Sequence, residues 1–249
     1  MLRGAPAGSP RAGADGSAYP LVRRPGLDVV DGVAESVIAG AMASDDDWFD
    51  SGLREVCRAI LAADRDPAVV GHLVRFDSGG GFVSAGQLVA DTLASLKKPR
   101  IAHVAYACSA AYMAACACDE VMLVDELATV GSIGVMQSWP AWFLEYYAVI
   151  QTDIYARTSD EKNAEFRALV GDRDHGPTKD HLDLLDAAFV AHVKRSRDAA
   201  QGISIDDDAL RGGVYVGRDA IARGLADSVG NYAHARRRLA QISPLNPVN

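Results

Sequence analysis

The sequence predicts an α/β protein in which strands and helices alternate and build a largely parallel sheet. Short apolar runs alternate with segments whose apolar residues recur at three- and four-residue steps. Two glycine-rich turns follow predicted strands, at 77–81 and 131–134. The C-terminal third differs, because residues 178–200 have the pattern of one long amphipathic helix. Together these observations predict βαβ units with a helical C-terminal part.

The elements follow in order along the chain. The predicted strands are 33–42, 69–76, 101–107, 121–124 and the GGVYVG segment at 212–217. The predicted helices are 48–63, 83–96, 109–118 and 178–200. Asp66-Pro67 ends the first helix and Pro99 ends the second. We expect a single domain over 31–249, preceded by an arm at 1–30 whose Gly, Ala, Pro and Arg content predicts disorder.

Composition argues against several classes of function. The chain is 49% hydrophobic and 23% charged, which is typical of a globular protein, and its net charge of −8 argues against nucleic acid as a partner. The six His form no cluster with metal-ligand spacing, so we expect no metal and no other cofactor. No apolar run is long enough to cross a bilayer, and the arm has no hydrophobic signal segment. We therefore expect a cytoplasmic protein without a membrane anchor.

The cysteines and the first glycine turn each allow two interpretations. Cys57, Cys108, Cys116 and Cys118 lack the paired spacing of a zinc site, and we interpret them as buried core residues in a reducing compartment. The turn at 77–81 has neither the Walker pattern nor GxGxxG. Its glycines fit a plain turn and an oxyanion site equally well, because both need a close-lying backbone.

Ser109 lies where a predicted strand meets a predicted helix. That position alone favours a helix N-cap, although the small residues after it would let a substrate backbone approach. A serine nucleophile needs a base, and the chain has neither a GxSxG motif nor a convincing His–Asp arrangement. The base would then be a lysine whose pKa is lowered by a dry pocket. Cys108 has no His placed to activate it.

The order of these motifs resembles the signal peptide peptidase A family of serine–lysine peptidases, including its phage branch, the head-maturation (capsid assembly) proteases. The DSxGG-like turn is followed by Ser-Ala-Ala-Tyr, by Val-Gly-Ser-Ile-Gly-Val, and then by a lysine in YARTSDEKNAEF. The resemblance covers 32–239. It implies a crotonase/Clp-protease-like fold, a βαβ spiral with a helical C-terminal part.

The resemblance also implies roles for individual residues. Ser109 would be the nucleophile, Lys162 the general base, and Ser132 the residue that orients the lysine. The backbone amides of Gly80 and Gly81 would line the oxyanion hole, with a further amide from Ala110 or Ala111. Two features depart from the family pattern: Gly79 stands where proline is usual, and the loop before Lys162 lacks its usual glycine. Lys179 and Lys194 are the rival bases, although both fit solvated helix charges better.

We therefore expect a serine endopeptidase whose substrates are polypeptides. The family's phage branch would process scaffold, capsid or portal proteins in the host cytoplasm or virion; other members degrade signal peptides or small proteins. Family members act as rings, so we expect a homo-oligomer. Two alternatives remain open at this point: a crotonase-like acyl-CoA enzyme that uses Gly80 and Gly81 for a thioester enolate, and a catalytically silent scaffold protein.

Overall fold

The computed structural model describes residues 11–12, 18–19, 27–43, 52–150, 152–159 and 161–243. The chain divides into two compact units: unit 1 comprises 1–133 and 192–249, and unit 2 comprises 134–191. Most of the arm predicted to be disordered lies outside the described residues. Within it, β1 (Arg11–Ala12) and β2 (Ala18–Tyr19) pair antiparallel. The predicted single domain over 31–249 stays a prediction.

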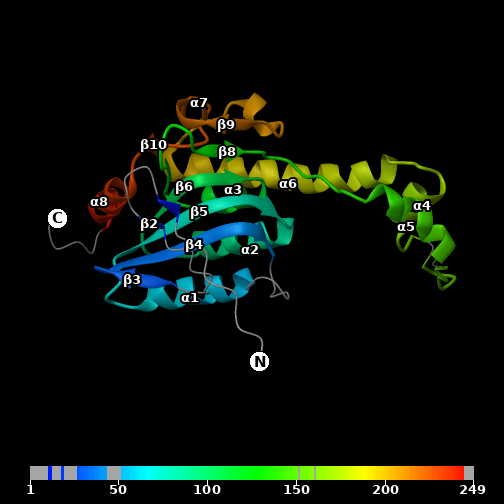
Figure 1. The fold of residues 1–249 in the computed structure, drawn as a ribbon, viewed down its shortest axis with the longest axis horizontal. Helices are drawn as coiled ribbons and strands as arrows, with labels where there is room; N and C mark the ends of the chain where they lie inside the picture. Colours follow the sequence, from blue (N-terminus) through cyan, green and yellow to red (C-terminus); the bar gives the residue numbers. More distant parts are fainter. Residues whose placement is uncertain are drawn as a thin grey trace. The chain divides into compact units, whose positions relative to one another are not determined.

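Unit 1 is built on an eight-stranded sheet in which six strands follow the order β10-β7-β6-β5-β4-β3; the other two are β8, which pairs with β6, and β9, which pairs with β8 (Figure 1). Its strands are β3 (Asp28–Val30), β4 (Val33–Met42), β5 (Gly71–Gly81), β6 (Arg100–Cys108), β7 (Glu120–Leu123), β8 (Thr129–Gly131), β9 (Val214–Val216) and β10 (Ser228–Val229). All pairings are parallel except β3 with β4 and β8 with β9. The predicted parallel sheet is therefore confirmed.

Helices cover the two faces of this sheet. They are α1 (Leu53–Arg65), α2 (Val83–Ala94), α3 (Ala110–Ala115), α7 (Gly217–Ala222) and α8 (Tyr232–Ile242), with a 3₁₀ turn at Asp207–Leu210. Val33 packs with Leu239 of α8, whereas its neighbour Ala34 packs with Ala63 of α1. Because successive strand residues point to opposite faces, these two clusters are the cores of the two faces.

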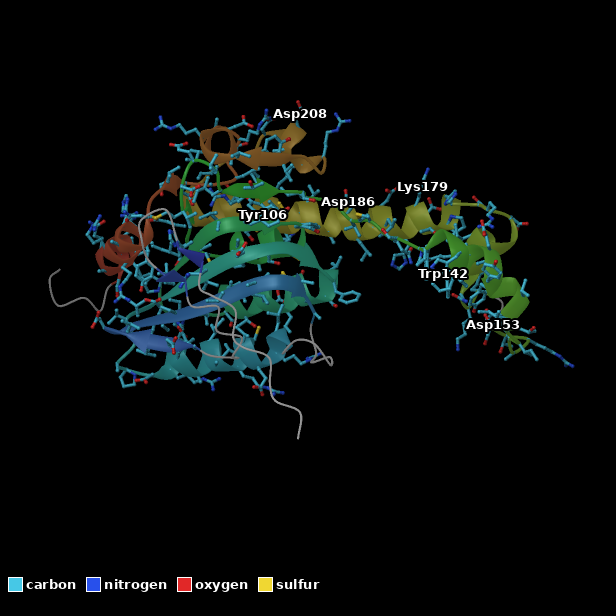
Figure 2. The ribbon with its side chains drawn as sticks, in the orientation of Figure 1. Tyr106, Trp142, Asp153, Lys179, Asp186 and Asp208 are labelled. Atoms are coloured by element: carbon cyan, nitrogen blue, oxygen red, sulfur yellow. The ribbon has the colours of Figure 1, made fainter. Side chains whose placement is uncertain are left out.

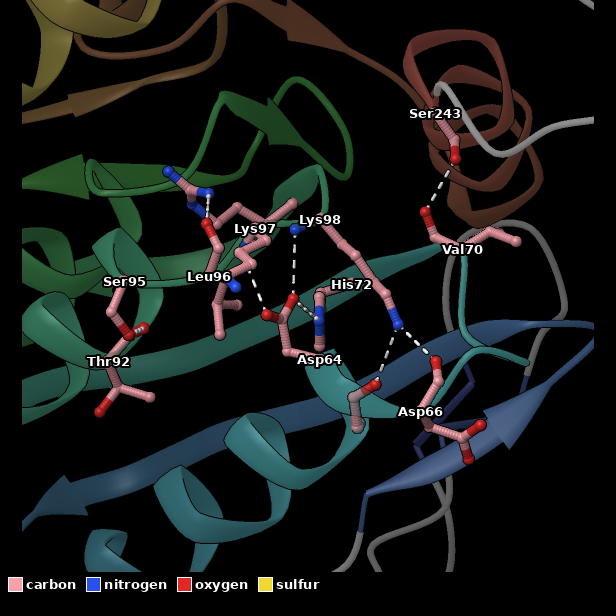
Figure 3. A network of polar contacts seen from close by, with 12 residues as sticks. Asp64, Asp66, Val70, His72, Thr92, Ser95, Leu96, Lys97, Lys98 and Ser243 are labelled. Carbon is pink, nitrogen blue, oxygen red and sulfur yellow. Dashed lines mark hydrogen bonds and ion pairs between the residues drawn. The ribbon is translucent and has the colours of Figure 1, made fainter.

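A polar network connects α1 to the start of β5, as Figure 3 shows. The Asp64 carboxylate accepts hydrogen bonds from the backbone amides of Lys97 and Lys98, and it lies 3.2 Å from His72 Nε2. His72 is completely buried, and its Nδ1 has no partner among the described residues. Lys98 Nζ in turn donates to the carbonyl oxygens of Ala63 and Asp66 at the end of α1. The network therefore binds one of the last carbonyls of the helix, that of Ala63, and the carbonyl of its C-cap residue Asp66.

Unit 2 is helical. It holds α4 (Ala141–Ile150), α5 (Ala164–Gly171) and the first part of α6 (Gly176–Gln201), which continues into unit 1. An aromatic cluster joins α4 to α5: Phe166 lies 4.5 Å from Tyr147 and 6.0 Å from Phe143, between ring centroids. The long helix predicted at 178–200 is confirmed with slightly wider limits.

Several predicted boundaries need correction. The turn predicted at 77–81 was wrong, because β5 continues as a strand through Gly81 beside Met42 of β4. The predicted helix at 109–118 is shorter, ending at Ala115, although the whole segment is buried apart from its first residue. The first helix begins at Leu53, and residues 48–51 of its prediction lie outside the described part. Among the described residues, no helix is both long and apolar enough to span a membrane.

Candidate active site

Ser109 occupies the junction between β6 and α3 in a strained backbone conformation. Its φ is 54° and its ψ is −127°, a region that residues other than glycine rarely adopt. Ser109 is the N-cap residue of α3, as its position predicted, but its side chain makes no capping hydrogen bond. Its amide donates to Gly131 O at 2.9 Å, which fixes the junction against the end of β8. The strain is therefore stored in a residue whose hydroxyl is left available for chemistry.

Gly80 lies directly against this junction. A Cβ atom at Gly80 would stand 2.7 Å from Cys108 O, 2.8 Å from Ser109 Cβ and 2.9 Å from Ala110 N, and its φ is 97°. No other residue type fits this space or this conformation without displacing the backbone. Gly81 is equally confined, because a Cβ there would collide with the backbone of Met42. Gly80 thus lets β5 pass close to Ser109, and Gly81 lets it lie close to Met42 of β4.

Ser78 supports this close approach from within β5. It is 1% exposed, and its hydroxyl donates to Gly40 O at 2.6 Å and accepts the Gly80 amide at 3.1 Å. The register shifts here, because Ser78 and Gly79 of β5 stand opposite the single residue Gly40 of β4; Ser78 therefore ties this bulge to the glycine pair. The Gly80 amide would have to leave Ser78 before it could bind an oxyanion. Sequence reasoning missed Ser78, although it stands inside the DSGGG motif.

Ala110 begins the helix that follows Ser109. The amides of Tyr112 and Met113 both donate to the Ser109 carbonyl, so the hydrogen bonding of α3 starts after Ala110 and Ala111. Ala110 is buried, and its amide nitrogen lies near the space that a Gly80 Cβ would fill. The structure therefore brings Gly80, Ser109 and Ala110 together.

Ser132 is the counterpart of Ser109 on the neighbouring strand. β6 and β8 run parallel with Cys108 opposite Gly131, and each serine is the residue that directly follows its strand. Ser132 also has a positive φ, 51°, and its amide donates to Gly213 O at 2.6 Å. Two serines with unusual backbone conformations thus follow the paired ends of two adjacent strands, an arrangement typical of functional sites.

Lys162 belongs to unit 2, in the turn that precedes α5. Its side chain is exposed, and its amide donates to Ser159 O at 3.1 Å. Asp160 lies outside the described residues, and Glu161 is exposed. Of the rival bases, Lys194 forms an exposed ion pair with Asp207 at 2.9 Å. Lys179 is an exposed residue near the start of α6 and is labelled in Figure 2.

Gly79 departs from the pattern of the family that the sequence resembles, and in the structure the ring of Tyr106 lies beside it. A Cβ at Gly79 would lie 3.4 Å from Cε1 of Tyr106, whose ring on β6 is partly exposed (Figure 2). The aromatic ring therefore stands beside the backbone at the position where the family usually has proline. Sequence reasoning alone offered no signal for this pair.

A buried ion pair lies beside α3, the helix that follows Ser109, and binds the same 224–227 segment as that helix. Arg197 of α6 is fully buried and binds the Asp227 carboxylate with two nitrogens, at 2.6 and 3.0 Å. It also donates to Gly224 O at 3.0 Å, while the Tyr112 hydroxyl of α3 donates to Leu225 O at 2.8 Å. Burial raises the pKa of Tyr112 well above its ordinary value, so this hydroxyl stays a donor. Sequence reasoning missed this ion pair.

The cysteines are core residues, as predicted. All four are buried and free, and burial raises the pKa of Cys116 to about 12 and that of Cys108 above its ordinary value. A buried thiol that holds its proton is a poor nucleophile, so Cys108 does not compete with Ser109. Among the described residues, no group of three His, Cys, Asp or Glu side chains is placed to hold a metal ion.

Comparison with known proteins gives one family and one fold. The model of peptidase family S49 matches residues 93–246. A mutant of the 1510-N membrane-bound stomatin-specific protease superposes with a TM-score of 0.50 at 14% identity, covering 83% of each chain. An enoyl-CoA hydratase/isomerase family member gives 0.49 at 16% identity, covering 87% of this chain and 74% of that one. No curated protein matches. The predicted mixed α/β fold of the crotonase/Clp-protease type is confirmed.

Proposed function

Because the chain belongs to peptidase family S49, whose members are serine peptidases with a Ser–Lys dyad, we propose that Ser109 is its nucleophile and Lys162 its general base. The substrates of such an enzyme are polypeptides. The observation that carries the assignment of Ser109 is its strained, uncapped position between β6 and α3. Membership of a peptidase family favours this function over both an acyl-CoA reaction and a silent scaffold.

The reaction follows from these roles. Ser109 Oγ attacks the scissile carbonyl carbon as its proton passes to Lys162 Nζ, and the carbonyl oxygen becomes an oxyanion. The amides of Gly81 and Ala110 stabilise that charge; the Gly80 amide joins them if it leaves Ser78. The lysine then returns the proton to the departing amine, which leaves an acyl-enzyme. Water hydrolyses this ester after the lysine takes its proton.

Ser132 is proposed to orient the ammonium group of the lysine. Its support is the parallel register of β6 and β8, which places Ser132 next to Ser109 at the ends of paired strands. A hydroxyl has both a donor and an acceptor, so it can hold a lysine in its neutral and charged forms. Ser132→Ala should therefore reduce kcat more than it raises KM.

The exposure of Lys162 bears directly on the proposal. A lysine acts as a base near neutral pH only when its ammonium form loses hydration. The described side chain is exposed, so a further surface must cover it in the active enzyme. We propose that a homo-oligomeric ring provides that surface, with the lysine acting on its own or a neighbouring subunit's serine.

The biological role proposed here is processing of scaffold, capsid or portal proteins during phage head assembly, in the host cytoplasm or the virion. The support is the resemblance of the motif order to the phage branch of the family. Degradation of signal peptides or small proteins in the bacterial cytoplasm is the alternative within the same chemistry. Scaffold or portal genes beside the gene for this chain would favour the first role.

The test is cleavage of casein and of a scaffold-like polypeptide by wild type, Ser109→Ala and Lys162→Ala. We expect both variants to lose cleavage while they keep the secondary structure and the assembly state of wild type. Lys179→Ala is the matched control, because it removes a rival exposed lysine from the same unit. Retained cleavage in Lys162→Ala together with loss in Lys179→Ala would move the base to Lys179. Retained cleavage in Ser109→Ala would exclude the proposed nucleophile.

A further inference from the structure

Unit 2 contains a cavity outside the proposed catalytic residues. Its volume is about 850 Å³, and its walls come from α4, from α5 with the turn before it, and from the first turns of α6. Cavities of this size are typical of sites that bind small molecules or side chains of a partner. All its lining residues fall between 137 and 184, so the cavity belongs entirely to unit 2.

Aromatic rings form one wall of this cavity. Phe166 of α5 lies at the centre, with its ring centroid 5.1 Å from that of Trp139 and 4.5 Å from that of Tyr147. Phe143 completes the cluster and stacks on Trp139 at 5.6 Å. Trp139 remains 38% exposed, so part of this aromatic surface is open to a ligand.

The charges of the cavity have one sign. Glu161, Glu165 and Asp180 contribute carboxylates, and no Lys or Arg is among the lining residues. The only lining group that can become positive is His181, and its Nδ1 lies 3.0 Å from Glu165 Oε1. An apolar occupant would remove the Glu161 and Asp180 carboxylates from water without giving them a partner, which is unfavourable. A cationic occupant would pair with them and would also gain cation–π attraction from the rings.

We propose that this cavity binds arginine side chains of the polypeptide substrate, as an accessory site separate from the dyad. Arginine fits better than a point charge, because its planar guanidinium pairs with carboxylates and stacks on aromatic faces. This inference rests on the proposed peptidase function, since it assigns the ligand to the substrate. The cavity would then select basic segments and raise their local concentration near the enzyme.

The experiment measures binding separately from cleavage. A fluorescein-labelled peptide of alternating Arg and Leu is titrated with the full-length Ser109→Ala variant, and anisotropy is recorded; a second peptide carries Gln in place of Arg. The test variant adds Glu165→Gln and Asp180→Asn, which remove two cavity charges. The matched control adds Asp172→Asn and Asp183→Asn instead, because both are exposed acidic residues of unit 2 that do not line the cavity. Glu161 is left intact because it adjoins Lys162.

We expect the cavity variant to bind the Arg peptide about tenfold or more weakly than its parent, and the control variant to change by less than about twofold. An equal loss of affinity in both variants would mean that binding depends on the total negative charge of unit 2 and not on the cavity, and it would overturn the proposal. Equal binding of the Gln peptide would also overturn it, in favour of an apolar partner or a second copy of the chain. Trp139→Leu should weaken the Arg peptide further; no change would remove the aromatic part of the proposal.

Cleavage kinetics then distinguish this proposal from that of the dyad. With Ser109 restored, the cavity variant should show a raised KM for Arg-containing substrates and an unchanged kcat. Wild type that binds the Arg peptide but cleaves nothing would contradict the proposed function and leave the binding site standing. Wild type that cleaves Arg and Gln substrates with equal KM would contradict the accessory site and leave the dyad standing.

Discussion

Ser109 and Lys162 are carried by regions of opposite character. The serine stands between a central parallel strand and a buried helix, and neighbouring backbone fixes its amide. The lysine stands in an exposed turn of a helical unit. A nucleophile and its oxyanion donors must be held within fractions of an ångström, which the end of a central strand can provide. A base on a loop needs a further contact to lose water and take up its position.

The glycines show the same contrast. A Cβ at Gly80 would meet three backbone or side-chain atoms within 3 Å, whereas a Cβ at Gly171 of α5 would meet nothing within 4 Å. A Cβ is therefore excluded at Gly80 beside Ser109 but has room at Gly171 of α5. The comparison implies that mutations near Ser109 disturb folding and activity together, whereas mutations near Lys162 change activity alone.

The largest effect on the rigid region around Ser109 is expected from Arg197→Met. Removal of the guanidinium leaves the Asp227 carboxylate buried without its partner, so we expect unfolding to become easier by about 3–5 kcal/mol. Lys194→Met on the same helix removes only an exposed ion pair, and about 0–1 kcal/mol is expected. Denaturant titration of both variants measures the difference. Equal stabilities would show that the support behind α3 is not important for folding.

A second test places a methyl group against Ser109, the proposed nucleophile. Gly80→Ala should lower activity more than about a hundredfold, because the new Cβ displaces Ser109 or β5, and should lower stability by about 1–3 kcal/mol. Gly171→Ala is the control, since its site is open and alanine favours helix; stability should stay equal or rise by up to about 1 kcal/mol. Activity assays and thermal melts measure both. A fully active Gly80→Ala would show that the space beside Ser109 accepts a methyl group, contrary to the rigidity inferred for this site.

Sequence reasoning reached the parts of the site that depend on local pattern. Ser109, Gly80 and Ser132 stand in short motifs at strand ends, and the structure gathers them because parallel strands align those ends. It missed the continuation of β5 through Gly81, since that depends on the length of β4 beside it. It also missed the Arg197–Asp227 pair, because partners 30 residues apart meet only through tertiary structure.

Unit 2 was the least predictable region for a different reason. Its helix α4 is apolar on several faces, with Trp142 and Val149 61% and 79% exposed, so it lacks the one-sided periodicity that identifies a surface helix. The exposed Trp142 is labelled in Figure 2. The function of Lys162 was assigned by resemblance and not by local chemistry, and no contact in the described residues replaces that argument.

A third test uses pH to compare a buried histidine of unit 1 with an exposed one of unit 2. Burial lowers the pKa of His72 below its ordinary 6.5, and the contact with Asp64 only partly opposes this. The unfolded chain therefore binds a proton below pH 6.5 that the folded chain refuses, and stability should fall as pH falls below 6.5. The slope from this group is at most about 1.4 kcal/mol per pH unit.

The measurement is the melting temperature of wild type, His72→Gln and His175→Gln between about pH 7.5 and about pH 5. An ordinary histidine gains its proton within this range. His72→Gln should be less stable at neutral pH but flatter in its pH dependence. His175→Gln, whose side chain is exposed, should follow the wild-type curve. Parallel curves for all three proteins would remove His72 from the account of acid sensitivity.

The smallest expected change in stability is at Lys162, the proposed general base. Lys162→Met should alter the free energy of unfolding by less than about 0.5 kcal/mol, because the side chain is exposed, yet it should abolish cleavage. The free energy of unfolding, measured on assembled and on dissociated protein, distinguishes two surfaces that could cover Lys162: a neighbouring subunit and the substrate. If assembly covers this lysine, Lys162→Met should raise the stability of the oligomer relative to the free chain, since a methionine is easier to bury than an ammonium group. A change of equal size in both states would mean that the covering surface comes from the substrate, and it would contradict the proposal that a ring completes the dyad.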